Sequence, residues 1–153
     1  PHIFAAGDVT GRLMLSSVAA AEGDLVGRLV AGLPAAPVDH ALAAQAVFTE
    51  PEVAWVGLQE AEAAAAGRRV RVGRAPFSTN ARALITARPR GLVKLISDPD
   101  DDTILGGVVV GREAAELIGT LALAVRARIT RAMLAGTLLA YPSLSETLAA
   151  AAR

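Results

Sequence analysis

The chain has no cysteine, and this absence excludes several kinds of site at once. No disulfide framework, no thiolate metal site and no cysteine redox centre can be built from these 153 residues alone. Only His2 and His40 supply imidazole side chains, and two isolated histidines do not predict a zinc site. We therefore expect no metal site within this chain.

Aromatic residues and net charge are also scarce. Only 3% of the residues are aromatic, and 15 basic residues balance 15 acidic ones. Nucleic-acid binding normally needs a basic surface or stacking aromatic side chains, so we predict no nucleic-acid partner. No apolar run in the sequence reaches the roughly 20 residues that span a bilayer. We expect no membrane span and, by default, a cytoplasmic location.

Apolar residues, in contrast, are plentiful. The chain is 53% hydrophobic, and its mean hydropathy of +0.44 is high for a monomer. Although much of this excess is alanine, the balance predicts some surface that a partner covers. The length suits one domain, or one domain with a fragment of another. Because the chain opens without Met inside an apolar run, we expect a piece of a longer protein.

The first pattern is an apolar run at residues 3–6 that ends at Gly7 and Asp8, followed by helical spacing over residues 13–30. This order predicts a buried strand, a tight turn and a helix. Free N–H groups at a helix start attract electron-rich ligands, and an adjacent carboxylate accepts hydrogen bonds from ligand hydroxyls. From the Gly-Asp pair alone, a turn-capping role for Asp8 is favoured over ligand binding.

After a connector with Pro34 and Pro37, the pattern changes to strands and then helices. Apolar and alternating runs predict strands at 45–49, 53–58, 70–72, 92–96 and 104–110, the last two forming a hairpin. Helical spacing predicts helices at 59–66, 112–129, 130–138 and 144–152, with a polar, partly helical excursion at 80–90. We therefore predict an α+β fold, an antiparallel sheet with helices on one face.

Three motifs carry a family resemblance: Phe-Ala-Ala-Gly-Asp at 4–8, Val-Phe-Thr-Glu-Pro-Glu-Val-Ala-Trp-Val-Gly at 47–57, and Tyr-Pro-Ser-Leu-Ser-Glu at 141–146. Together they resemble the FAD-dependent pyridine nucleotide-disulfide oxidoreductases, which include dihydrolipoamide dehydrogenase, glutathione reductase, mercuric reductase and the soluble transhydrogenase. The resemblance implies that residues 1–32 are the tail of the FAD-binding domain, a strand–helix remnant. Residues 33–39 would be a connector, and 40–153 the FAD/NAD-linked reductase dimerisation domain.

The resemblance also implies a flavin site shared between two copies of the chain in a homodimer. Asp8 would hydrogen-bond the ribityl chain of FAD, which raises its ligand role above turn capping. The following helix start would direct backbone N–H groups at the pyrimidine edge of the flavin. The cofactor-binding residues implied in this way are Gly7, Asp8, Met14, Leu15, Ser16, Ser17 and Pro142.

On the acceptor side, many relatives carry His where this chain has Tyr141, and pair it with the downstream Glu as acid and base for a dithiol. An unperturbed tyrosine is a poor base at neutral pH, although its hydroxyl still donates a hydrogen bond. The resemblance implies catalytic roles for Tyr141 and Glu146, acting from the partner subunit. Plain interface packing for Tyr141 and a first-turn helix role for Glu146 remain equally open.

The Tyr-Pro pair, together with Phe-Ser-Thr-Asn-Ala-Arg-Ala at 77–83, is especially similar to quinone-reducing actinobacterial members and to the soluble transhydrogenase. The implied function is the dimerisation portion of an NAD(P)H oxidoreductase with a small-molecule electron acceptor. Among the possible reactions with the acceptor, we rank quinone reduction first, transhydrogenation second and dihydrolipoamide dehydrogenase chemistry third. No Gly-x-Gly-x-x-Gly motif is present, so NAD(P)H would bind outside this chain and the fragment alone would be inactive. A non-enzymatic interaction domain is the alternative of another class.

Overall fold

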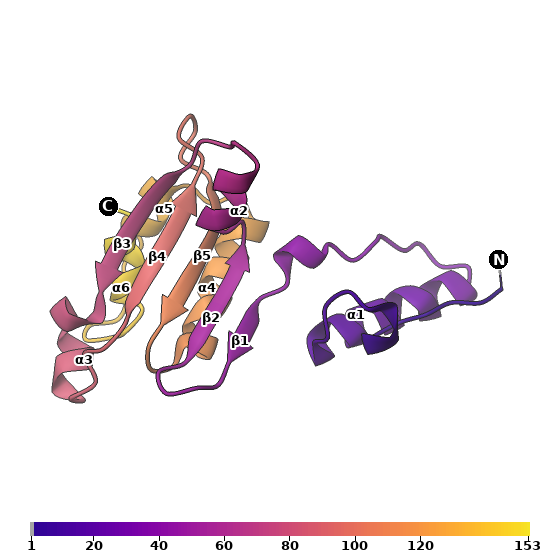
Figure 1. The fold of residues 1–153 in the computed structure, drawn as a ribbon, viewed down its shortest axis with the longest axis horizontal. Helices are drawn as coiled ribbons and strands as arrows, with labels where there is room; N and C mark the ends of the chain where they lie inside the picture. The colour runs from indigo at the N-terminus through magenta and orange to yellow at the C-terminus, as the bar shows by residue number, and fades with distance from the viewer. Residues whose placement is uncertain (1) are drawn as a thin grey trace. The chain divides into compact units, whose positions relative to one another are not determined.

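The computed structural model describes residues 2–153, which form two compact units divided between Ala43 and Ala44. The first unit contains one α-helix, α1 (Ser16–Val30), with a 3₁₀ turn before it at Asp8–Thr10 and another after the connector at His40–Leu42 (Figure 1). Within the described residues, no helix is long and apolar enough to cross a membrane.

Two expectations for this unit are wrong. The strand predicted at residues 3–6 is absent, because a strand needs a neighbour for its backbone groups and none lies in the described residues 2–43. The helix predicted from Leu13 begins at Ser16, since Leu15 precedes it with an extended backbone (φ −127°). The apolar spacing therefore located the helix but not its first turn.

The second unit is built on a five-stranded sheet in the order β1-β2-β5-β4-β3, with every neighbouring pair antiparallel (Figure 1). The strands are β1 (Gln45–Val47), β2 (Val53–Gly57), β3 (Arg71–Pro76), β4 (Leu92–Ser97) and β5 (Ile104–Val110). The predicted antiparallel sheet and its β4–β5 hairpin are confirmed. β3 is longer than predicted, because it pairs with β4 from Arg71 to Pro76.

The helices of this unit are α2 (Glu60–Ala65), α3 (Ala81–Ile85), α4 (Ala114–Arg126), α5 (Arg131–Ala135) and α6 (Glu146–Ala151). Each predicted helix is present but shorter at its ends. α4 begins after Glu113 and ends before Arg128, because both residues adopt left-handed backbone angles (φ 59° and 53°) that an α-helix excludes. Thr130, the first residue of the helix predicted at 130–138, caps α5, since its side chain accepts a hydrogen bond from Met133 N.

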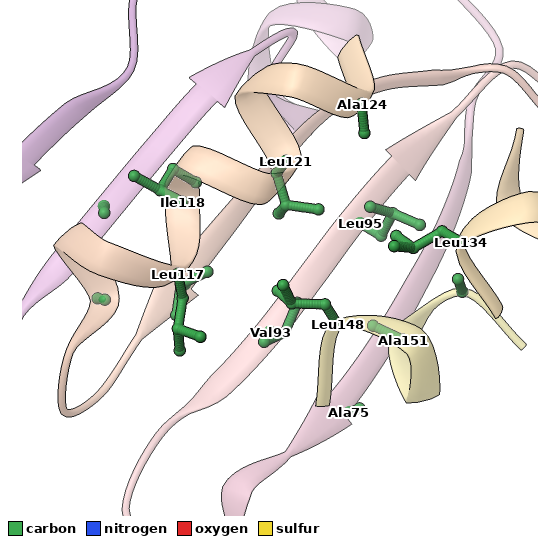
Figure 2. Close-up of a cluster of buried hydrophobic side chains, with 14 of the residues drawn as sticks. Ala75, Val93, Leu95, Leu117, Ile118, Leu121, Ala124, Leu134, Leu148 and Ala151 are labelled. Carbon is green, nitrogen blue, oxygen red and sulfur yellow. The ribbon is translucent and has the colours of Figure 1, made fainter. Parts of the chain in front are cut away.

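The core lies between one face of the sheet and the helices α4, α5 and α6, as Figure 2 shows. Val93 and Leu95 of β4 are fully buried there against Leu121 of α4 and Leu148 of α6. Helix α4 approaches closely because β5 carries a glycine beneath it: a Cβ on Gly107 would lie only 2.6 Å from Leu121 Cδ1. The expectation of helices on one face is confirmed for these three.

Helix α2 lies on the other face of the sheet. Glu60 of α2 accepts hydrogen bonds from Lys94 Nζ (3.1 Å) and Arg74 Nη2 (2.8 Å). Lys94 sits between two core residues of β4, so the alternation of a strand directs it away from the core. The hydrogen bond from Lys94, followed by that from Arg74, lowers the pKa of the Glu60 carboxyl.

Candidate functional site

The Gly7–Asp8 turn is closed by its own backbone. The carbonyl of Gly7 accepts from Thr10 N (2.9 Å) and Thr10 Oγ1 (2.8 Å), and the carbonyl of Asp8 accepts from Gly11 N (3.0 Å). Gly7 has φ 79°, a left-handed conformation that favours glycine, and a Cβ there would lie 3.3 Å from Ala19 Cβ. The exposed Asp8 carboxylate accepts no hydrogen bond within residues 2–153, which leaves it available to a ligand.

The start of α1 has no side-chain cap. Leu15 occupies the capping position and makes no side-chain hydrogen bond, so the first N–H groups of the helix have no intrahelical acceptor. Ser16 and Ser17 form the exposed first turn, as the predicted flavin-facing helix start requires. Met14, also predicted to open the helix, instead lies before it and is 74% exposed, because the chain becomes helical only at Ser16.

A buried carboxylate holds this turn, and it was not among the predicted site residues. Glu22 of α1 is only 7% exposed. Its Oε2 accepts from Gly7 N at 2.7 Å, and its Oε1 lies 2.8 Å from His40 Nε2. The hydrogen bond with His40, and then that from Gly7, lowers the pKa of Glu22. The available signal was a glutamate on the apolar stripe of a helix, because a buried charge requires a partner.

The second predicted segment, residues 141–146, lies at the start of α6. The Tyr141–Pro142 peptide bond is cis, and the Tyr141 side chain is 77% exposed. Tyr141 and Glu146 line one open depression of about 360 Å³. No hydrogen bond joins their side chains within the described residues. The structure thus brings the two acceptor-side residues together without pairing them.

Glu146 instead bonds the backbone of its own loop. Its Oε2 accepts from Ser143 N at 3.0 Å, a contact across three residues that resembles half of a capping box. Ser145 takes the capping position of α6 with a helical backbone and makes no side-chain hydrogen bond. The carboxylate of Glu146, predicted to be catalytic, therefore also makes a hydrogen bond that stabilises its own loop.

Asn80 is a second residue absent from the predicted site. Its Nδ2 donates to Ser143 O (2.9 Å) and to Thr147 Oγ1 (3.0 Å), and its Oδ1 accepts from Ala83 N (3.0 Å). The side chain thus caps α3 and binds the 141–146 segment at the same time. An Asn directly before a helical Ala-Arg-Ala pattern is a helix-start signal, but no local pattern indicates its distant partners, Ser143 and Thr147.

The predicted cofactor residues before position 18 lie in the first unit, and Tyr141, Pro142 and Glu146 lie in the second. Among residues 2–153, no cluster of His, Cys, Asp or Glu is arranged to hold a metal ion. The arrangement therefore offers a free carboxylate and an uncapped helix start in one unit. In the other unit it offers an exposed phenol held beside a carboxylate.

A family model described as "Pyridine nucleotide-disulphide oxidoreductase, dimerisation domain" matches residues 43–152. Dihydrolipoyl dehydrogenase 2 of Haloarcula marismortui is 44% identical over 154 residues, which cover 99% of this chain and 32% of that protein. The dihydrolipoyl dehydrogenase of Chlorobaculum parvum is 41% identical over 150 residues, covering 98% of this chain and 32% of that protein.

The solved structure of LpdA from Mycobacterium tuberculosis matches with a TM-score of 0.91 and 41% identity, over 97% of this chain and 32% of that one. The HOCl-induced flavoprotein disulfide reductase RclA of Escherichia coli matches with a TM-score of 0.87 and 26% identity, over 95% of this chain and 34% of that one. The chain thus spans about a third of the length of the proteins it matches.

Proposed function

The chain belongs to the pyridine nucleotide-disulphide oxidoreductase family and carries its dimerisation domain, and on this premise we propose that it is the C-terminal portion of an FAD-dependent NAD(P)H oxidoreductase. Residues 1–32 are the tail of the FAD domain, 33–39 the connector and 40–153 the dimerisation domain. The NAD(P)H site and most of the FAD site lie outside this chain.

The residues present fit a flavin. The free carboxylate of Asp8 suits a hydrogen bond from a ribityl hydroxyl, and Gly7 keeps the turn tight beside it. The uncapped N–H groups at Ser16 and Ser17 suit the electron-rich edge of a flavin, with Met14 and Leu15 on the approach to that helix start. When bound, FAD carries a hydride equivalent from NAD(P)H to the acceptor.

Dimer formation is supported by the exposed apolar side chains of the second unit. Leu123 and Met133 are more than half exposed on α4 and α5, and Leu138 is fully exposed. Obligate homodimer interfaces are large and apolar, and they cover side chains of this kind. In the proposed homodimer, each copy contributes its 141–146 segment to the flavin site of its partner.

The acceptor is proposed from one observation. Glu146 bonds Ser143 N, and an exposed Tyr141 stands where a dithiol oxidoreductase needs a base. Without a paired acid and base, an acceptor that needs no thiol proton transfer is favoured. We therefore place a quinone first and a nicotinamide nucleotide second. Dihydrolipoamide is the other candidate, favoured by the names of the relatives at 44% and 41% identity.

The test uses the full-length protein that contains this chain. NAD(P)H oxidation is measured with a water-soluble benzoquinone, with thio-NAD and with lipoamide as separate acceptors. We expect a yellow, dimeric protein that reduces benzoquinone fastest. A colourless full-length protein would overturn the flavin assignment, whereas fast lipoamide reduction without benzoquinone reduction would overturn only the choice of acceptor.

Two variants assign the two halves of the site. Asp8→Ala is expected to weaken FAD binding by about 10- to 100-fold, because a charged hydrogen-bond acceptor is lost. Tyr141→Phe is expected to retain FAD while changing the rate with the acceptor. If Asp8→Ala retained FAD fully, Asp8 would be an ordinary turn residue and not a flavin ligand. If Tyr141→Phe lost its flavin, the assignment of Tyr141 to the acceptor side would be wrong.

A further inference from the structure

The backbone of Ser143 is held from both sides by side chains. Its N–H donates to Glu146 Oε2 at 3.0 Å, and its carbonyl accepts from Asn80 Nδ2 at 2.9 Å. Ser143 directly follows the Tyr141–Pro142 pair, so these two bonds constrain the backbone position and orientation of that pair. A third bond, from Asn80 Nδ2 to Thr147 Oγ1 (3.0 Å), ties the same amide to α6.

The orientation of the Asn80 amide follows from its partners. A backbone carbonyl only accepts and a backbone N–H only donates, so Nδ2 must face Ser143 O and Oδ1 must face Ala83 N. The side chain is 7% exposed. A buried amide with each of its polar atoms bonded holds its partners strongly, because an unpaired buried group is costly.

Helix capping alone does not explain why position 80 is an asparagine. The cap of α3 uses only Oδ1, which Asp, Ser or Thr would supply equally well. The two bonds from Nδ2 need an uncharged amide, and they reach residues 63 and 67 positions away in the chain. The choice of Asn over other capping residues is thus explained by the contact with the 141–146 segment.

We propose that Asn80 is a positioning residue for the acceptor side of the flavin site: it clamps Ser143 and thereby fixes where Tyr141 and Pro142 are presented to the partner subunit. This inference rests on the proposed function, since it takes the 141–146 segment to be the part of this chain that meets flavin and acceptor. Asn80 and Tyr141 line the same depression, which places the clamp directly beside the group it positions.

The deciding variant is Asn80→Asp in the full-length protein. The introduced carboxylate still caps α3 at Ala83 N, and it is favoured there by the helix dipole. It cannot donate to Ser143 O, and two acceptor oxygens would face each other across the present 2.9 Å contact. The variant therefore removes the clamp while keeping the cap.

Two half-reactions are measured by stopped flow, with benzoquinone and lipoamide as oxidants of the reduced flavin. We expect Asn80→Asp to slow flavin oxidation by about 10-fold or more, because small displacements of an acceptor-side group are costly. Reduction of the flavin by NAD(P)H is expected to stay within about 2-fold of wild type, because the proposed NAD(P)H site lies outside this chain. A purely structural defect would lower both rates or the flavin content.

Hydrogen exchange supplies a readout that depends on neither flavin nor acceptor. Peptides covering residues 141–147 are expected to exchange at least about 10-fold faster in Asn80→Asp. The matched control is Thr130→Ala, which removes the cap of α5 at Met133 N and leaves the Ser143 bonds intact. The control is expected to leave both the exchange of 141–147 and flavin oxidation unchanged.

The outcomes separate this inference from the proposed function. Unchanged exchange at 141–147 in Asn80→Asp overturns the clamp, and faster exchange with an unchanged rate of flavin oxidation overturns the positioning role. In both cases the wild-type enzyme is active. Failure of the proposed function looks different, since the wild-type protein itself would then reduce none of the three acceptors.

Discussion

Different interactions stabilise the interior of each of the two units of this chain. In the described residues 2–43, Val18 is the one buried hydrophobic side chain, and one hydrogen bond from Gly7 N to the Glu22 carboxylate ties the turn to α1. In residues 44–153, a continuous apolar core lies between the sheet and α4, α5 and α6. The stability of the second unit should therefore fall most when a buried side chain is made smaller. The turn in the first unit should respond most to the loss of a hydrogen bond or a charge.

The two candidate site segments differ in the same way. The Gly7–Asp8 turn is anchored by an ionised carboxylate, whereas Ser143 is anchored in part by the neutral amide of Asn80. An amide does not titrate, so its bond is independent of pH. A carboxylate anchor weakens once it is protonated. Ser143 also donates to the Glu146 carboxylate, but it keeps its bond from Asn80 in acid, so the Gly7–Asp8 turn should be the more acid-sensitive of the two segments.

The largest effect is expected from the core of the second unit. Leu121→Ala should lower the free energy of unfolding by about 3 kcal/mol, because it opens a cavity at a side chain with no exposure. Urea unfolding of the chain, followed by the fluorescence of Trp55, measures it. Thr120→Ala is the matched control on the same helix: Thr120 is exposed, and its replacement should change the free energy of unfolding by under about 0.5 kcal/mol.

The next effect is local and belongs to the first unit. Glu22→Ala leaves the Gly7 N–H without its acceptor, so amide exchange at Gly7 should rise by about 10- to 100-fold. Glu22→Gln keeps an acceptor oxygen and should retain most of the protection. Equal exchange in wild type and Glu22→Ala would mean that the turn is held by its own backbone bonds alone.

Acid should weaken the same anchor. The pKa of Glu22 is lowered by the hydrogen bonds from His40 and Gly7, with a smaller contribution from the charge of Arg12. A lowered pKa adds stability that is present above the ordinary carboxyl range and is lost as pH falls through the lowered value. Exchange protection at Gly7 should therefore fall in acid in the wild type. A pH-independent wild type, matching Glu22→Gln throughout, would contradict this.

The smallest effect is expected from an exposed charge on the same helix. Asp24 accepts from Arg28 Nε at 2.7 Å, but the two side chains are 66% and 50% exposed. Such a pair contributes little, so Asp24→Asn should shift Tm by no more than about 1 °C. If Asp24→Asn and Glu22→Ala were found to lower Tm equally, burial would not be what separates the two carboxylates.

Part of the architecture was predictable because it rests on local patterns. Alternation and turn residues located the β4–β5 hairpin, and Thr130 marked a helix start that the structure confirms. The order of strands and helices indicated the antiparallel sheet, and three motifs indicated the family. Helix ends were less predictable, because Glu113 and Arg128 adopt left-handed backbone angles that their residue types do not indicate.

The contacts of the candidate site residues could not be predicted from the sequence. The sequence indicated Asp8, Tyr141 and Glu146 as functional residues, and their roles stay predictions. It did not indicate Glu22 or Asn80, whose partners lie 15 and 63 residues away. The strand predicted at residues 3–6 failed for the same reason, since pairing depends on a neighbour that local pattern does not supply.

The sequence by itself determined the fold class, the family and the absence of any cysteine chemistry in this chain, because these depend on residue identity and short-range order. Only the tertiary structure decided what Glu146 and Asn80 bind, because a hydrogen bond between distant segments depends on how the whole unit packs. It also showed that Tyr141 and Glu146 share a depression without pairing. That geometry carries the proposal of an acceptor other than a thiol.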